Sequence, residues 1–324
     1  MPVLLLVRSV IGGVLMGLAN LVPGISGGTM LLAAGVYPAF INAIAELTTL
    51  RFKTRSMIVL GGVGLAAALA ILLLAGTVKD LVVEHRWMMY SLFIGLTLGG
   101  IPIISKMMRP TTRDTWIGAA AGFIAMGLLA YVQQAQVGAA GASSGVVMLF
   151  VAGLAGASAM ILPGVSGGYL LLVLGQYVPI LAAIDDLKLA LKGGEMGAVI
   201  EIGLKVILPV GLGVLVGVVG VSNLLRALLK RYEKVTLGVL FGLLLGAVVG
   251  LWPFQQGVEP RVGDVIKGQA MTSASLAELD AEDYPTEYFQ PTGGQAGGAL
   301  ALIVAGFLVT FVISRIGGDH EETG

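Results

Sequence analysis

Two nearly identical glycine-rich segments hold the residues of this chain that could do chemistry. Residues 23–28 read PGISGG and residues 163–168 read PGVSGG, and we call these segments the first and second tips. Proline cannot donate a backbone hydrogen bond, and glycine reaches conformations closed to other residues, so each tip should end one helix and begin another. The predicted helix breaks are Pro23 and Gly24 in the first tip, and Pro163 and Gly164 in the second.

A helix that begins at each tip would offer a site for an anion. The first backbone amides of a helix have no acceptor within it, and with the helix dipole they suit a phosphate or a carboxylate. A serine at the N-cap could add its hydroxyl. The residues predicted to bind phosphate are Ser26, Gly27, Gly28 and Thr29 at the first tip, and Ser166, Gly167, Gly168 and Tyr169 at the second. A kink that only packs helices is the alternative interpretation.

Arg8 is a further candidate for binding the phosphate, because it lies within the first apolar stretch. A cation there could neutralise a bound anion, or its long side chain could reach the headgroups at the membrane surface. The chain has no cysteine, which excludes disulfides and thiolate metal sites. No metal and no cofactor is predicted.

The first tip also fits the G-x-S-x-G element of serine hydrolases, at residues 24–28. Such enzymes need a base beside the serine, usually a histidine. The two histidines of the chain are His85, at a loop edge, and His320, in the C-terminal tail. We therefore predict that the protein is not an enzyme, with a membrane serine hydrolase or lipid phosphatase as the alternative.

The rest of the sequence is typical of a membrane protein. Hydrophobic residues make up 56% of the 324 residues and charged residues only 12%, and several apolar runs approach the roughly 20 residues that cross a hydrocarbon core. The 19 basic and 19 acidic residues balance, so nothing indicates a nucleic-acid partner. We predict an all-α polytopic membrane protein whose tips are positioned by transmembrane helices.

The two tips belong to an internal repeat. The similarity continues to Tyr37 and Tyr177, and residues 95–99 resemble residues 242–246. We predict two membrane repeats, residues 1–138 and 139–324, each with a broken hairpin around its tip followed by three spans. The hairpins could be re-entrant or fully spanning. The spans are expected at residues 57–77, 87–107 and 115–132, then at residues 197–221, 235–253 and 296–314.

Charge predicts the orientation in the membrane. Basic residues gather in segments 51–55, 106–113 and 226–234, which should be cytoplasmic. Residues 255–295 form an acidic loop, which should be extracytoplasmic. These assignments agree only if the second repeat is inverted relative to the first. Inverted repeats are typical of transporters that bind substrate near the bilayer midplane, where broken helices meet.

Three stretches carry a family resemblance: MGLANLVPGISGGTM at residues 16–30, MILPGVSGGYLLLVLGQY at residues 160–177 and GLLLGAVVGLWP at residues 242–253. They resemble the PopT family of bacterial polyprenyl-phosphate translocases, over nearly the whole chain except the acidic loop. The family pattern often has serine in place of Gly168 and an acidic residue in place of Asn20. Neither difference alters the glycine backbone of the tips.

The resemblance implies a flippase that recycles undecaprenyl phosphate, the lipid carrier of cell-wall synthesis, to the inner leaflet of the bacterial cytoplasmic membrane. The tips would hold the phosphate while the polyprenyl tail remains in the bilayer. A small-anion transporter or channel is the other alternative. The oligomeric state, the coupling ion and the chain length of the lipid are left open.

Overall fold

The computed structural model describes residues 2–21, 25–134, 145–167, 170–171, 174–266, 269–277, 279 and 284–315. Within these residues, six helices are long and apolar enough to cross a membrane, or up to seven if one bent helix pair counts as a span. The prediction of an all-α polytopic membrane protein is confirmed, although the acidic loop also contains short strands.

Seven helices come from the predicted first repeat. They are α1 (Pro2–Asn20), α2 (Gly27–Ala33), α3 (Tyr37–Thr48), α4 (Thr54–Glu84), α5 (Arg86–Leu98), α6 (Ile101–Met108) and α7 (Arg113–Gln134). The predicted spans at 57–77 and 115–132 fall on α4 and α7. The span predicted at 87–107 is divided between α5 and α6. Pro102 causes this division, because it cannot donate to the carbonyl of Leu98, where α5 ends.

The predicted second repeat contains the remaining membrane helices. They are α8 (Val146–Ile161), α10 (Tyr177–Gly193), α11 (Met196–Ile202), the π-helical turn η1 (Gly203–Ile207), α12 (Leu208–Arg231), α13 (Glu233–Gly250) and α15 (Gly293–Arg315). The spans predicted at 197–221, 235–253 and 296–314 fall on α11–α12, α13 and α15. The wide turn η1 ends two residues before Pro209, which has no amide hydrogen for an α-helical hydrogen bond to the carbonyl of Lys205.

Equivalent helices of the two halves pack in equivalent pairs. α1 packs on α4 as α8 packs on α12, and α7 packs on α13 as α15 packs on α5. Glycines at matching positions permit these close approaches: a Cβ on Gly13 would collide with the carbonyl oxygen of Val63, and one on Gly153 with that of Val210. Small residues at such interfaces let membrane helices approach to backbone contact.

The second pair of similar segments, residues 95–99 and 242–246, also makes matching helix contacts. A Cβ on Gly95 of α5 would collide with the carbonyl of Ile303 in α15, and one on Gly242 of α13 with the carbonyl of Ala119 in α7. Gly95 and Gly242 begin the two similar sequences at residues 95–99 and 242–246. The sequence repeat is therefore accompanied by repeated helix contacts.

The first hairpin consists of α1 and a broken return arm. α1 has 19 residues, enough to cross most of a hydrocarbon core, whereas α2 and α3 are bent from one another by 117°. Gly35 separates α2 from α3 with a φ of +68°, a conformation that glycine adopts without strain. The short helix α2 therefore begins at the first tip and ends inside the protein.

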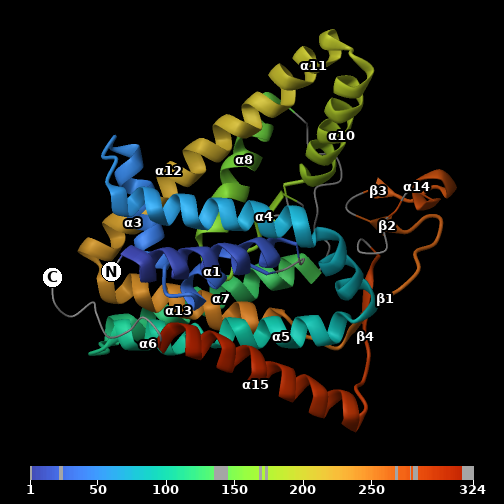
Figure 1. Cartoon of the computed structure of the whole chain (residues 1–324). Helices are drawn as coiled ribbons and strands as arrows, with labels where there is room; N and C mark the ends of the chain where they lie inside the picture. The colour runs from blue at the N-terminus through green and yellow to red at the C-terminus, as the bar shows by residue number, and fades with distance from the viewer. Residues whose placement is uncertain are drawn as a thin grey trace.

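The charged segments lie at opposite ends of the helices. Figure 1 shows the N-terminus, α3 and α6 at one end, and the strands of the acidic loop at the other. Lys234 donates to the carbonyl oxygens of Met108 and Arg109 at 3.0 and 3.1 Å, which joins the turn between α6 and α7 to the turn between α12 and α13. Two of the basic segments are thus adjacent.

The acidic loop has a small fold of its own that the sequence did not predict. Strand β1 (Gln255–Gly257) pairs with β4 (Thr286–Tyr288), and β2 (Val265–Ile266) pairs with β3 (Gln269–Ala270), both antiparallel. A short helix, α14 (Ser273–Ala277), follows β3. The pairing of β1 with β4 brings the two ends of the loop together between α13 and α15.

Candidate functional site

The first tip leads directly into the centre of the molecule. All seven residues of α2 are buried, and Leu31 and Leu32 belong to a core cluster that also contains Val63, Ile161 and Leu244. This cluster joins α2 to α4, α8 and α13. The helix that starts at the first tip is therefore held by both predicted repeats.

Within the described residues, three hydrogen bonds join the first tip, α2 and α3 to the end of α8 and the start of the second tip. Ser26 Oγ donates to the carbonyl oxygen of Leu162 at 3.0 Å, and the hydroxyl of Tyr37 donates to that of Ile161 at 2.9 Å. In the opposite direction, the amide of Gly164 donates to Thr29 Oγ1 at 2.8 Å. The last carbonyls of a helix have no intrahelical donor, so side chains from the first half satisfy the end of α8.

Gly28 allows this contact because it has no side chain. A Cβ at this position would lie 2.8 Å from the carbonyl oxygen of Ile161 and 3.1 Å from that of Met160. Both obstacles are backbone atoms, which cannot rotate away as a side chain could. The N-terminus of α2 therefore lies against the C-terminal end of α8 at backbone distance.

Ser26 occupies the predicted N-cap position, but its hydroxyl does not cap α2. The prediction of a capping hydroxyl is wrong because the carbonyl of Leu162 takes this donor instead. Among the described residues, the amides of Gly27, Gly28 and Thr29 have no backbone acceptor. Pro23 and Gly24, which precede this helix, lie outside the described residues, so the binding of phosphate by these amides stays a prediction.

The second tip is broken at the predicted place. α8 ends at Ile161, and Gly164 has a φ of +85°, which glycine adopts easily. Ser166 is half-buried, and a Cβ on Gly167 would lie 2.8 Å from the carbonyl oxygen of Gly156. The other predicted tip residues, Pro23, Gly24, Gly168 and Tyr169, lie outside the described residues.

Arg8 is not brought to the first tip. Its Nε donates to the carbonyl oxygen of Ala34 at 3.2 Å, and its guanidinium group lies against Gly35. This is the C-terminal end of α2, roughly 10 Å from the tip at 1.5 Å per residue. A cation at this end of a helix stabilises its last carbonyls. The structure thus gives Arg8 a different contact from the one predicted.

The chain is similar in sequence to known proteins of one family. Residues 16–266 match a family described as undecaprenyl phosphate translocase-like. The chain belongs to this family. It is 30% identical to a polyprenyl-phosphate transporter of Vibrio cholerae, over 83% of this chain and 85% of that protein. It is 29% identical to a polyprenyl-phosphate transporter of Staphylococcus aureus, over 76% of this chain and 86% of that protein.

No solved structure matches the chain. The family match includes both tips but only the beginning of the acidic loop, residues 255–266. The resemblance to bacterial polyprenyl-phosphate translocases is confirmed at the level of the family. The comparisons do not assign a role to any tip residue.

The contacts of Ser26 do not provide a hydrolase site in this family member. Its hydroxyl donates to a backbone carbonyl, and a carbonyl oxygen cannot act as the general base that a serine nucleophile requires. His85 lies at the junction of α4 and α5, and His320 lies outside the described residues. The geometry of Ser26 therefore favours a role in helix contact.

Two functional contacts were missed by reasoning from the sequence. The sequence marks Tyr37 only as a repeated residue and Thr29 only as a source of a backbone amide. The structure shows the Tyr37 hydroxyl bonded to the last residue of α8, and the Thr29 hydroxyl bonded to the second tip. The repetition of tyrosine at positions 37 and 177 was the one available signal. Nothing in the sequence indicated that the partner atoms would be backbone atoms of α8 and the second tip.

Proposed function

We propose that this membrane protein is a transporter of undecaprenyl phosphate or a related polyprenyl phosphate, and that it returns this lipid to the inner leaflet of the bacterial cytoplasmic membrane. The observation that carries the proposal is the pair of hydrogen bonds at the buried start of α2, from Ser26 to Leu162 just before the second tip and from Gly164 of the second tip to Thr29. The names of the two relatives support the same substrate class.

The phosphate is held by the two tips during transport. The bare amides of Gly27, Gly28 and Thr29, the hydroxyls of Ser26 and Ser166, and the amides that follow Ser166 are the proposed ligands. Such donors offset the large cost of removing a phosphate from water. The polyprenyl tail stays in the bilayer, so only the headgroup has to cross the protein. No covalent chemistry is needed, and the protein is not an enzyme.

The two halves, residues 1–138 and 139–324, act as inverted repeats. The matched glycine contacts of Gly13 and Gly153, and of Gly95 and Gly242, support this proposal. In the state described, the hydrogen bonds between the tips close the centre of the protein. Movement of one repeat against the other would break these bonds and open the centre to one side of the membrane at a time.

The basic segments are proposed to face the cytoplasm and the acidic loop the exterior. Lys53→Cys and Ala274→Cys test this orientation in a chain that has no other cysteine, and both positions are exposed. An impermeant thiol reagent added to intact cells should label position 274 and spare position 53. Permeabilised cells should show labelling at both. Labelling of position 53 alone in intact cells would reverse the orientation.

Transport itself is tested with purified protein in liposomes. A fluorescent polyprenyl phosphate should become accessible to an impermeant quencher faster than in protein-free liposomes, with no release of inorganic phosphate. Release of phosphate would identify a lipid phosphatase. Flux of inorganic anions in liposomes without the lipid would identify a small-anion transporter or channel. Unchanged sidedness of the lipid would refute the proposed function.

A further inference from the structure

A hollow between α3 and α12 combines two cations with apolar walls. It is lined by Pro38, Ile41 and Asn42 from α3, and by Arg226, Leu229 and Lys230 from α12. Asn223 of α12 donates to Thr48 Oγ1 of α3 at 2.9 Å, which joins the same two helices further along α3. Figure 1 shows α3 at the end of the molecule that carries the basic segments, so the hollow, which α3 lines, lies at this end.

Arg226, which lines this hollow, has an unsatisfied hydrogen-bond donor. Its Nε is buried and has no hydrogen-bond partner. No acidic residue lines the hollow, and within the described part of the chain neither Arg226 nor Lys230 forms an ion pair. A buried donor without an acceptor is unfavourable. These groups therefore suit an anion with several oxygen atoms.

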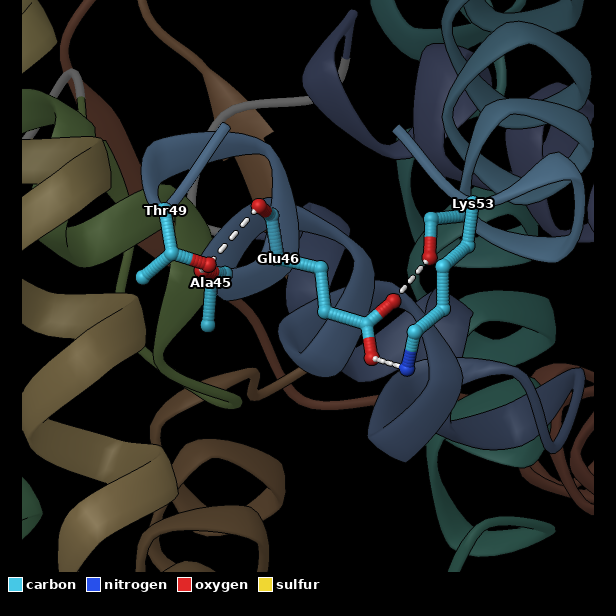
Figure 2. Close-up of polar contacts among 5 residues, drawn as sticks. Ala45, Glu46, Thr49 and Lys53 are labelled. Carbon is cyan, nitrogen blue, oxygen red and sulfur yellow. Dashed lines mark hydrogen bonds and ion pairs between the residues drawn. The ribbon is translucent and has the colours of Figure 1, made fainter. Parts of the chain in front are cut away.

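The nearest acid, Glu46, is already engaged by other groups. Its Oε1 accepts from Lys53 Nζ at 2.7 Å, and its Oε2 accepts from Ser56 Oγ at 2.6 Å. Figure 2 shows the carboxylate of Glu46 turned toward Lys53, while Thr49 bonds to the backbone of Ala45. Glu46 lies in the last turn of α3. Arg226 adds only a weaker Coulomb attraction to its carboxylate, after the hydrogen bonds from Lys53 and Ser56, and within the described residues the ion-pair partner of Glu46 is Lys53.

A second hollow, entirely apolar, adjoins the first. The two share Pro38 and Leu229, and the second is also lined by Met107 of α6 and Leu237 of α13. A ligand with a charged head and a hydrocarbon tail could place its head at Arg226 and Lys230 and its first apolar units against Met107. An inorganic anion would use only the cationic hollow.

We propose that these two hollows form a binding site for a polyprenyl monophosphate at the cytoplasmic end of the protein, separate from the tips. This inference rests on the proposed function and identifies where the lipid is held before it is released to the inner leaflet. Arg226 offers several donors in a planar arrangement that matches phosphate oxygens, and Lys230 adds a second positive charge. Asn42 supplies an uncharged donor at the rim.

The test is binding of farnesyl phosphate to the purified full-length protein, measured by calorimetry. Arg226→Gln and Lys230→Gln should each weaken binding about tenfold or more, because each removes a charged hydrogen-bond donor. Arg231→Gln is the matched control: it removes the same charge from the next residue of α12, which does not line the hollow, and should bind within about twofold of the wild type.

Other ligands and one further variant distinguish binding of a lipid phosphate from binding of free inorganic phosphate. Met107→Gln should weaken binding of farnesyl phosphate and leave any binding of inorganic phosphate unchanged. Farnesol should bind weakly, and equally to the wild type, Arg226→Gln and Lys230→Gln, because it has no phosphate for these two residues to bind. If inorganic phosphate binds as tightly as farnesyl phosphate, the site serves the free anion. If phosphatidylglycerol competes equally, the hollow is a general contact for anionic lipids. Either result would overturn the proposal.

Transport measured in parallel separates this inference from the proposed function. Wild-type protein that moves the lipid in liposomes, while Arg226→Gln and Lys230→Gln bind farnesyl phosphate normally, would refute the cytoplasmic site alone. Wild-type protein that binds farnesyl phosphate at the hollow but moves no lipid would refute transport and retain the site.

Discussion

Gly28→Leu is expected to abolish transport of polyprenyl phosphate. A Cβ at this position would lie 2.8 Å from the carbonyl oxygen of Ile161, so the larger side chain would force the two tips apart and cover the amides proposed to bind phosphate. Overpacking of this kind also destabilises a protein by roughly 1–3 kcal/mol. The measurement is movement of a fluorescent polyprenyl phosphate in liposomes, normalised to the amount of folded protein.

Two further variants keep this prediction decisive. Gly28→Ala is a smaller change that should leave more folded protein and still slow transport. Gly64→Leu is the matched control, because Gly64 of α4 has open space where its side chain would be, and transport should be unchanged. Normal transport by both Gly28 variants would show that the close contact at the tip is not needed.

Gly167→Leu should resemble Gly28→Leu, since its Cβ would meet the carbonyl of Gly156.

The double variant Ser26→Ala/Ser166→Ala is expected to be the second most damaging change. Each single variant should slow transport between a few-fold and about a hundredfold, because a hydroxyl contributes about 1 kcal/mol, or up to about 3 when it meets a charge. The double variant should be slower than either, since both hydroxyls are proposed to bind one phosphate. Ser26→Thr retains a donor for the carbonyl of Leu162 and should be milder.

A hydrolase would respond differently to the same substitutions. Loss of a catalytic nucleophile typically slows a reaction by several orders of magnitude, and threonine would not replace it. If one serine is indispensable, the other is silent and a fluorophosphonate labels the indispensable one, the transporter proposal would fail. Release of inorganic phosphate from the lipid, measured in the same liposomes, provides an independent check.

The features of the fold that could be predicted are those that depend on the residues of one segment alone. Apolar runs near the length of a membrane crossing located five of the six predicted spans on helices long and apolar enough to cross a membrane, and the sixth on α13, because chain length and hydrophobicity are properties of each segment alone. The break at Pro163 and Gly164 followed from the backbone limits of these two residue types. The division between α5 and α6 was missed, although Pro102 carried the same signal.

Features that depend on distant partners were not predictable. The strands β1 and β4 pair across the acidic loop, and their sequences are too short to show a strand pattern. Arg8 was expected near the first tip, yet it bonds to Ala34 at the other end of α2. The hollow at Arg226 exists only because α3 and α12, distant in sequence, are packed together.

The sequence by itself determined the membrane architecture, the repeat and the place of both tips, because these follow from hydrophobicity, charge and the conformational limits of proline and glycine. Only the tertiary structure decided what the tips contact. Ser26 donates to Leu162 and Tyr37 to Ile161, and in each case the acceptor is a backbone carbonyl at or just after the end of α8. Every residue has such a carbonyl, so no sequence pattern marks the one that remains unsatisfied until the helices have packed.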